Sequence, residues 1–443
     1  MSFYLKELTL KNYKKYKENT LTFNNKFNLL VGENATGKTT ILDGIATALG
    51  GYLQCFNTIL TKDTHGIKSR DIHVKYLISN NGIEKIENIP VEIIAGFDID
   101  GESIELKRVK KNIKQGTILN KKENIEIYKK VKTIENYINE NKEITLPIFS
   151  YHGTGRLWEQ DNKNSSRMEN LKRVDGYKDC LNARSNYRNF ISWFEKLERH
   201  AFNIREENPV LQSVKSIIGL TLEKLTQKKV KQVIYREDDL EIHYFSDSEI
   251  QRIGLLSDGY RNIIGLVSDI AYRMALLNPH LNDKIINTPG IVLIDEIDLH
   301  LHPKWQREIT GLLRELFPNI QFIASSHSPF IIQSMNKKEI ISLDENDTLL
   351  ANGTEMSIED ISENIMNVKL PQQSKRKLDM LNAANEYFDI LEKLENNEVN
   401  ESEVEKLKEK LDELSEPYED NMAYVAFLKR KRLLSEAKLE GKV

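Results

Sequence analysis

The feature that most constrains the fold is the segment Gly32–Thr39, which reads Gly-Glu-Asn-Ala-Thr-Gly-Lys-Thr. It fits the pattern G-x-x-x-x-G-K-[ST], a loop that surrounds phosphate groups with backbone N–H donors. The apolar run Phe27–Val31 before it is typical of a buried strand, and Thr40–Leu49 after it has helical spacing, with Gly50 and Gly51 expected to stop the helix. In this order the positive end of the helix faces the anion. The sequence therefore predicts an α/β fold that binds a nucleoside triphosphate.

Composition bounds the remaining possibilities. The chain has 443 residues, 40% hydrophobic and 29% charged, which is the balance of a soluble globular protein with room for two or three domains. It has no run of 18 apolar residues, and its start, Met1–Leu10, alternates like a strand rather than like a signal peptide. Cys55 and Cys180 are too few for a disulfide framework or a cysteine metal site. We therefore expect a cytoplasmic protein without membrane contact.

The net charge of −4 argues against a chain that is basic throughout, but it permits a local basic strip. Two runs are dense in lysine and arginine, Lys107–Lys114 and Lys429–Arg432. Each run is either a solvated face or a contact for nucleic acid, and the sequence leaves both interpretations open.

Changes in pattern divide the chain into four parts. The first holds the phosphate loop and a mostly β subdomain, the second is helical, the third returns to strands and helices, and the fourth is helical again. The boundaries fall at residues 1–150, 151–255, 256–350 and 351–443. Within the first part, a hairpin turning at Asp100-Gly101 and a polar helix over Glu123–Glu140 are predicted.

The last part is expected to be a helical extension, because apolar residues recur there at three- or four-residue spacing. The series is Leu378, Leu381, Ala384, Phe388, Leu391 and Leu394. Short helices with one apolar stripe must bury it. The stripe either packs on the chain's own core or forms a surface for self-association or for a partner.

A second apolar strand, Ile291–Ile294, ends in two acids, Asp295 and Glu296. Beside a phosphate loop, such a strand delivers its aspartate to the metal edge of the site, so we expect Asp295 and Thr39 to hold Mg²⁺. Glu296 is placed to orient or deprotonate an attacking water. Without the phosphate loop, the same segment would be interpreted as an ordinary strand followed by acidic turn residues.

Two further motifs complete a resemblance to ABC-type ATPase heads. Leu256–Tyr260 reads Leu-Ser-Asp-Gly-Tyr before a predicted helix that ends at Leu277, and it matches that family's signature loop. An apolar strand ends at His327, 31 residues after Glu296, where the family places its switch histidine. Together with Gly32–Thr39 and the two acids, these motifs stand in the family's order. The chain resembles the RecF, SMC-like and OLD (overcoming-lysogenization-defect) group of these heads.

The resemblance implies a P-loop ABC-type ATPase head with a mixed sheet, an antiparallel β subdomain and a helical lobe. It implies ATP and Mg²⁺ as cofactors and an association of two heads around ATP. Catalysis would fall to Lys38, Glu296 and His327. Nucleotide contacts would come from Gly32, Asn34, Ala35, Thr36, Gly37, Lys38, Thr39, Thr40 and Lys14, and from Ser257 and Gly259 of a second protomer. Ser257 reads otherwise as a helix N-cap and Lys14 as a solvated lysine.

The chain also departs from the family's pattern. Ala35 stands where a glycine is usual, so the loop must accommodate a Cβ. No glutamine stands clearly at the Q-loop position, where Gly153–Trp158 joins the lobes instead, and Arg156 either reaches phosphate or stabilises that junction. His300 and His302 are not read as metal ligands, because no third ligand cluster accompanies them.

Gly153–Trp158 and Leu256–Asn262 are most similar to the PtuA family, the ATPase subunits of Septu-type anti-phage systems. That resemblance implies a slow, regulatory ATPase whose head association controls a partner HNH nuclease, so that contact with nucleic acid would be indirect. The strand Glu339–Glu345 reads as the last of the ATPase sheet, and the helical tail after it leaves no room for the Toprim domain of OLD nucleases. Two alternatives stay open, a RecF-like DNA-repair clamp and an OLD-like nuclease.

Overall fold

A five-stranded parallel sheet forms the centre of the N-terminal part of the chain. Its strand order is β14 (Ile340–Ser342), β3 (Phe27–Val31), β13 (Ile320–Ser325), β12 (Gly290–Ile294) and β8 (Ile148–His152), and each neighbouring pair is parallel. The strands β3, β12 and β13 are buried along their whole length, as expected of a parallel sheet covered on both faces. Because parallel strands end at the same edge of a sheet, the loops that follow these three strands meet there.

The computed structural model describes the chain as two compact units, residues 1–366 and 367–443. Among the described residues, every strand lies in the first unit, and those of the second unit form helices. The described residues are 1–59, 64–79, 82–155, 172–183, 187–236, 241–246, 249–344, 353–366, 368, 372–395, 409, 412, 413, 416 and 421–439. Among them, no helix combines the length and the apolar composition that a membrane crossing requires.

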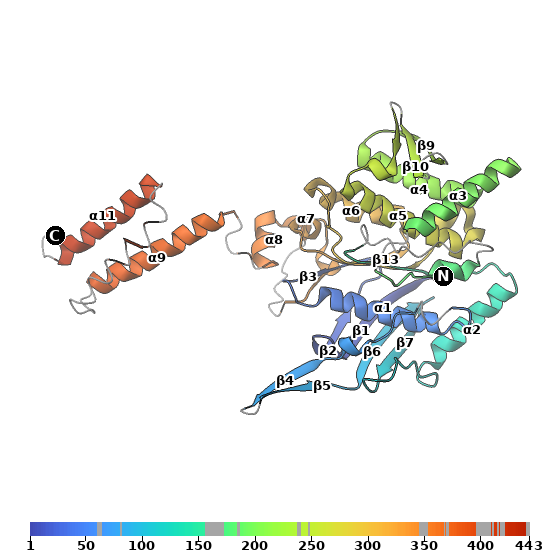
Figure 1. Ribbon diagram of the computed structural model, residues 1–443, viewed down its shortest axis with the longest axis horizontal. Helices are drawn as coiled ribbons and strands as arrows, with labels where there is room; N and C mark the ends of the chain where they lie inside the picture. Colours follow the sequence, from blue (N-terminus) through green and yellow to red (C-terminus); the bar gives the residue numbers. More distant parts are fainter. Residues whose placement is uncertain are drawn as a thin grey trace. The chain divides into compact units, whose positions relative to one another are not determined.

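A separate antiparallel sheet packs on the helix that follows the P-loop. Its strand order is β2 (Tyr16–Thr22), β1 (Phe3–Tyr13), β6 (Val91–Ile99) and β7 (Glu102–Lys110). The P-loop helix α1 (Lys38–Gln54) lies between this sheet and the parallel one (Figure 1). The hairpin between β6 and β7 turns where predicted, with positive φ at Asp100 (57°) and Gly101 (82°), and α2 (Ile125–Asn139) confirms the polar helix.

One prediction about α1 is wrong, because the helix does not stop at Gly50 and Gly51. It continues to Gln54, and both glycines are buried inside it. A Cβ on Gly50 would lie 2.5 Å from the His65 carbonyl oxygen, and one on Gly51 would lie 2.8 Å from the Arg108 side chain. The glycines therefore permit close packing against the helix, and this packing overrides their low helix propensity.

The helical lobe is built from α3 (Tyr187–Ile204), α4 (Pro209–Thr226) and α5 (Asp258–Leu277), which contact one another. A small antiparallel sheet packs on α4, in the order β11 (Ile250–Arg252), β10 (Glu241–Ser246) and β9 (Val230–Arg236). The motif Gly153–Trp158 is described only as far as residue 155, so the expectation for Arg156 lies outside the described residues.

Helices also connect and extend the parallel sheet. After β12, α6 (Pro303–Leu316) leads into β13, and the short α7 (Pro329–Ile332) contacts α8 (Ile358–Asn364). The predicted α/β class with a helical extension is confirmed, but the expected mixed sheet is not: parallel and antiparallel strands form separate sheets. In the second unit, α9 (Lys375–Glu395) and α11 (Met422–Leu439) pack together, and Phe388 meets Phe427 edge to face with ring centroids 6.0 Å apart.

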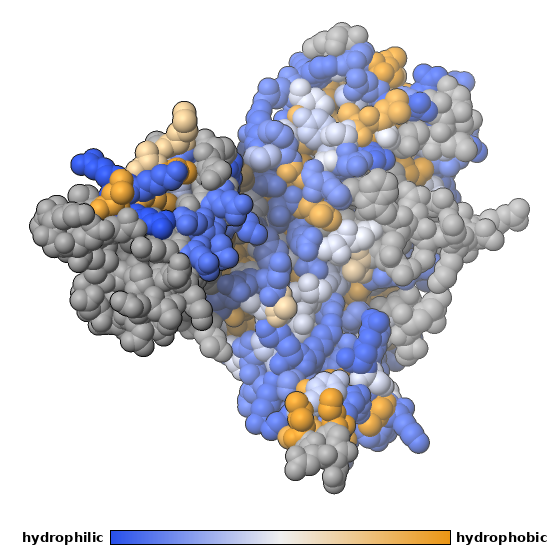
Figure 2. Space-filling view, turned by 60° about the vertical axis from the view of Figure 1, so that its left-hand side comes forward, coloured by the Kyte–Doolittle hydropathy of each residue, from blue (hydrophilic) through white to orange (hydrophobic). Residues whose placement is uncertain are grey.

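A hairpin of β4 (Val74–Ser79) and β5 (Gly82–Glu87) projects from the first unit (Figure 1). Its apolar side chains are strongly exposed, with 62% of Tyr76, 85% of Ile78 and 71% of Ile83 accessible to solvent. Figure 2 shows apolar side chains gathered at the lower end of a face that is otherwise mostly hydrophilic, where this hairpin lies.

The basic run Lys107–Lys114 is not a surface strip. Arg108 and Lys110 are buried, and the Arg108 guanidinium donates to the Thr47 carbonyl oxygen at 2.7 Å. Lys107 forms an ion pair with Glu92 at 2.8 Å. The Arg108 contact packs β7 on α1, and the Lys107 pair joins β7 to β6. These contacts remove the nucleic-acid interpretation for the first three cations of the run, whereas Lys111 and Lys114 are exposed.

The second basic run, on α11, is different. Lys429, Arg430 and Lys431 are exposed, whereas Arg432 donates to Asp412 at 2.6 Å. For this run, both sequence interpretations stay open.

Candidate nucleotide-binding site

The P-loop connects β3 to α1 in the predicted strand–loop–helix order. Three of its residues have a positive φ: Gly32 (148°), Ala35 (67°) and Gly37 (103°). Ala35 thus adopts a conformation that glycine favours, at a cost of about 1–2 kcal/mol for an L-residue. By adopting this conformation at Ala35, the loop accommodates its Cβ, and the strand–loop–helix order is unchanged.

The Lys38 side chain folds back over the start of its own loop. Its Nζ donates to the carbonyl oxygen of Gly32 at 2.7 Å and to that of Glu33 at 2.9 Å. An ammonium has three N–H donors, so these bonds leave one for an anion. Burial lowers the pKa of Lys38, while nearby carboxylates, that of Asp344 first, oppose the shift. The residue is therefore placed to hold phosphate.

The residues expected to hold the metal ion lie where the loops after β3, β12 and β13 meet. Thr39 Oγ1 donates to Asp295 Oδ2 at 2.9 Å, and Ser325 Oγ donates to Asp295 Oδ1 at 2.6 Å. The Ser325 hydroxyl also accepts the Glu296 N–H at 2.8 Å. One hydroxyl thus fixes both acids. Thr39 and Asp295 offer oxygen ligands beside an anion-binding loop, so the residues fit Mg²⁺.

Ser325 is a site residue that sequence reasoning missed. Its position follows from the parallel pairing of β12 and β13, in which Ile294 lies opposite Ala324. The next residues along the two strands, Asp295 and Ser325, are therefore neighbours. Aligning the ends of the two predicted strands could have found this contact.

The turn between β1 and β2 supplies two further contacts that sequence reasoning missed. Lys15 Nζ donates to the Ala35 carbonyl oxygen at 2.9 Å, and the Tyr16 hydroxyl donates to that of Thr36 at 2.8 Å. A Cβ on Gly37 would lie 2.7 Å from both side chains, so glycine is required for this approach as well as for its φ. The turn holds the outer side of the P-loop.

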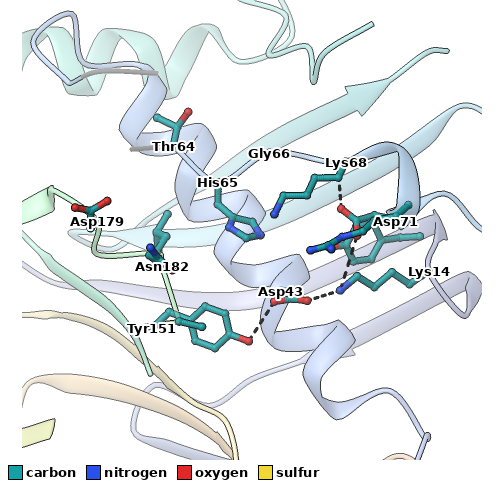
Figure 3. Close-up of a pocket in the computed structure, with 14 residues that line it drawn as sticks. Lys14, Asp43, Thr64, His65, Gly66, Lys68, Asp71, Tyr151, Asp179 and Asn182 are labelled. Atoms are coloured by element: carbon teal, nitrogen blue, oxygen red, sulfur yellow. Dashed lines mark hydrogen bonds and ion pairs between the residues drawn. The ribbon is translucent and has the colours of Figure 1, made fainter. Parts of the chain in front are cut away.

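Lys14, which was expected to touch phosphate, is held against α1. Its Nζ pairs with Asp43 and lies 4.0 Å from Asp71 Oδ1, and the Tyr151 hydroxyl donates to the other oxygen of Asp43 at 3.1 Å (Figure 3). Asp43 lies one helical turn after Thr39 on α1. A phosphate contact of Lys14 therefore stays a prediction, and it requires that Lys14 leave these partners.

The same residues border a polar cavity of about 500 Å³ (Figure 3). Cationic and acidic side chains both face it, among them Lys14, Lys68, Arg70, Asp43, Asp71 and Asp179. Burial lowers the pKa of His65 at this cavity. The size and the mixed charge suit a small polar ligand.

The signature loop presents a serine and a glycine at the start of α5. Ser257 is the N-cap residue, yet its exposed side chain makes no capping hydrogen bond. A Cβ on Gly259 would lie 2.6 Å from the His300 carbonyl oxygen, and Asn262 Nδ2 donates to the Leu299 carbonyl oxygen at 2.9 Å. The start of α5 thus rests on the chain that follows the two acids, and Ser257 does not serve as an ordinary cap.

His327 follows β13 and is half-buried. Burial lowers the pKa of its imidazole, and the positive charge of Lys38 lowers it further. The ring is therefore neutral at pH 7. The neighbouring Ser326 hydroxyl donates to Asp298 Oδ1 at 2.6 Å, which ties the segment before His327 to the loop after the acids.

The two histidines after the acids have structural roles. His302 Nδ1 accepts the Lys304 N–H at 3.3 Å and caps α6, while His300 has a positive φ of 62° and approaches Gly259 through its carbonyl group. Within the described residues, no group of three or more His, Cys, Asp or Glu side chains is arranged to hold a metal ion.

A buried network connects the signature helix to the strand pair that holds Asp295. The Ser150 hydroxyl of β8 donates to Asp269 of α5 at 2.7 Å, and Arg273 Nε donates to the same carboxylate oxygen at 2.9 Å. Burial alone would raise the pKa of Asp269, but Arg273 and His152 outweigh it and hold the pKa below its usual range. The His152 carbonyl oxygen accepts the Asp295 N–H at 2.8 Å.

Two family profiles match the chain. A profile described as the AAA domain matches residues 7–242, more than half of the chain, and one described as the AAA ATPase domain matches residues 195–332. Between them they include the P-loop, the signature loop, the two acids and His327.

Several known proteins are similar to this chain. "Retron Vc95 probable ATPase" of Vibrio cholerae serotype O1 biovar El Tor is 27% identical over 392 residues, covering 77% of this chain and 74% of that protein. "Septu protein PtuA" of Bacillus mycoides (strain KBAB4) is 27% identical over 322 residues, covering 72% of this chain and 36% of that protein. A solved SMC head bound to the C-winged helix domain of ScpA aligns with a TM-score of 0.46 and 19% identity, over 76% of this chain and 94% of that one.

Proposed function

Because the chain belongs to the AAA-domain family and is an ABC-type ATPase like PtuA, we propose that it is an ATP-operated switch whose heads associate around bound ATP. One observation carries the proposal: the phosphate and metal residues are held by partners in their own chain, whereas the Ser257 hydroxyl is exposed and makes no cap. We further propose slow hydrolysis that ends the association, and a cytoplasmic location.

ATP binding would use residues of one head. The P-loop N–H groups and the positive end of α1 face the phosphates, and Lys38 adds the free donor of its ammonium. Thr39 and Asp295 would hold Mg²⁺, which would supply positive charge to offset that of the phosphates. Ser325 would hold Asp295 in position throughout, since its hydroxyl is already bound to that carboxylate.

Hydrolysis would use Glu296 and His327. The Glu296 carboxylate would orient a water or accept its proton while the water oxygen bonds to the γ-phosphorus and the bond to the ADP oxygen breaks. The neutral imidazole of His327 would donate a hydrogen bond to the γ-phosphate. Glu296 follows β12 and His327 follows β13. Ser325, at the end of β13, connects the two strand ends because its hydroxyl accepts the Glu296 N–H.

The second head would complete the site through its signature loop. Ser257 and the N–H groups at the start of α5 form a second set of anion donors, with the positive end of a 20-residue helix behind them. We propose that Ser257 of one protomer acts on ATP held by Lys38 of the other. ATP would then be part of the interface, and its loss would separate the heads.

Mixing two inactive variants tests this arrangement. Lys38→Ala keeps an intact signature loop, and Ser257→Ala keeps an intact P-loop, so a mixed dimer contains one complete site although each variant alone contains none. We expect phosphate release to recover in the mixture, approaching half the wild-type rate per mixed dimer. A mixture with no more activity than the sum of its components would contradict completion of the site by a second protomer.

The partner proposal follows from the relatives. Since the chain resembles Septu protein PtuA, we propose that head association controls an HNH nuclease subunit, with the helical pair α9 and α11 as a docking surface. Co-expression with a neighbouring HNH reading frame and co-purification through a tag on the nuclease would test it. The RecF-like alternative predicts ATPase activity that DNA stimulates without any nuclease subunit. The nuclease alternative predicts Mg²⁺-dependent cleavage by the purified chain that survives Lys38→Ala.

A further inference from the structure

A carboxylate that has no part in the proposed phosphate contacts or hydrolysis lies against the P-loop. β14 pairs in parallel with β3, and the Leu343 N–H extends this ladder by donating to the Val31 carbonyl oxygen at 3.0 Å. The next residue, Asp344, therefore lies beside the first residues of the loop. Its Oδ1 accepts the Glu33 N–H at 3.4 Å, and its Oδ2 lies 3.3 Å from the point that a Cβ on Gly32 would occupy.

The second oxygen of this carboxylate is held by charge rather than by hydrogen bonds. Asp344 Oδ2 is buried and has no hydrogen-bond partner in the part of the chain that the structure describes. Buried carboxylate oxygens normally have one, because burial removes their hydration. The opposing charge is that of Lys38, whose Nζ donates to the carbonyl oxygens of Gly32 and Glu33, the two residues that Asp344 approaches. Among the carboxylates that keep the pKa of Lys38 from falling further, Asp344 has the largest effect.

We propose that Asp344 sets the nucleotide affinity of the site by placing a fixed negative charge against a loop that binds a polyanion. The inference rests on ATP binding at this P-loop, as proposed above. Without nucleotide, the carboxylate balances the charge of Lys38. With nucleotide bound, it is a like charge beside the phosphates, and repulsion between partly buried charges is weakly screened.

Two consequences follow from this repulsion. Asp344 weakens ATP binding more than ADP binding, because ATP carries the additional charge of the γ-phosphate. A single head therefore holds ATP loosely, and the anion donors of a second head offset the repulsion. Occupancy of the P-loop by ATP is in this way coupled to head association.

The variant Asp344→Asn isolates the charge. The amide has nearly the same shape, and its oxygen still accepts the Glu33 N–H, so the support of the loop is retained while the charge is lost. We expect the Kd for ATP to fall about tenfold and the Kd for ADP about threefold. Calorimetric titration of the full chain at low salt and low protein concentration measures both. Asp283→Asn, at an exposed acid outside the site, controls for the change in net charge and should bind ATP as the wild type does.

Three results would overturn the inference. Unchanged or weaker ATP binding by Asp344→Asn would make Asp344 a positioning group for the loop. An advantage of the variant that does not shrink as NaCl rises would exclude charge repulsion as its cause. If neither the wild type nor the variant binds nucleotide, the proposed ATP site itself fails, and the inference fails with it. Thermal unfolding checks that the variant is folded, and Asp344→Ser takes its place if it is not.

Discussion

The P-loop corner, by which we mean Lys38, Thr39, Asp295 and their hydrogen-bond partners, belongs to the same proposed site as the signature loop. The chain builds the two parts differently. In the P-loop corner, Lys38, Thr39 and Asp295 already have partners in their own chain, including the Ser325 hydroxyl. In the signature loop, Ser257 begins α5 without using its hydroxyl as a cap. A group that is fixed during folding loses no freedom when its ligand binds. On the proposed function, this difference predicts that one chain binds ATP alone and that a second surface completes the site.

The largest expected effect tests whether the P-loop corner also holds the group that acts on water. Glu296→Gln removes the carboxylate but leaves Lys38 and Thr39 intact, so turnover should fall by roughly 10²–10⁴-fold while ATP binding persists. Phosphate release measures the turnover, and light scattering after gel filtration should show an ATP-bound dimer that accumulates. Glu308→Gln, at an exposed position of α6, is the control and should leave both unchanged. Undiminished turnover in Glu296→Gln would show that Glu296 does not act on water and that the P-loop corner only binds ATP.

The next effect tests whether binding depends on the P-loop corner alone. Lys38→Ala removes an ammonium with a free donor, and ATP affinity should fall by on the order of 100-fold, since hydrogen bonds to charged groups contribute about 1.5–3 kcal/mol each. Titration calorimetry measures the affinity, and Lys17→Ala, an exposed lysine of β2, controls for lost charge. A loss smaller than about threefold would mean that ATP is held mainly elsewhere.

A smaller effect tests how tightly the chain holds the P-loop helix. Gly50→Ala would place a Cβ 2.5 Å from a backbone oxygen, that of His65, which cannot move independently. We expect a loss of about 1–3 kcal/mol in the free energy of unfolding, despite the higher helix propensity of alanine. Gly311→Ala in α6 is the matched control, because apart from the nearby backbone of α6 itself no atom lies within 4 Å of its Cβ position. It should gain about 0.5–1 kcal/mol. Urea unfolding distinguishes the two, and equal gains would show that Gly50 has no packing role.

The residues that sequence reasoning found and missed differ in what determines their position. Lys38, Thr39, Asp295 and Glu296 could be predicted for the proposed site because its chemistry requires these residue types after apolar strands. Ser325 and Asp344 were missed because their roles depend on which strands pair and in which register.

Local propensity also failed in specific places. Gly50 and Gly51 were expected to end α1, but tertiary packing determines what they do there. Arg108 and Lys110 belonged to a run that could have been a surface strip, and the fold buries both. The elements of the first unit, including the hairpin at Asp100-Gly101 and the last strand of the sheet, were predictable because their apolar periodicity and turn residues are local.

The smallest expected effect concerns the relation of His327 to the P-loop corner. Burial lowers the pKa of this imidazole, and the positive charge of Lys38 lowers it further, because an imidazolium and an ammonium repel each other. Lys38→Ala removes the second cause, so the pKa of His327 should rise toward its ordinary value of about 6.5, while burial keeps it below that value. In the wild type the ring gains its proton only as the pH falls below the lowered pKa.

An NMR titration of the histidine ring signals measures the change in the nucleotide-free protein. His327→Asn identifies the signal, and Lys17→Ala should leave the titration where it is. If Lys38→Ala also leaves it unchanged, the imidazole does not sense the ammonium. His327 would then not belong to the part of the site that one chain prepares for ATP. It would instead belong with the groups that a second protomer completes.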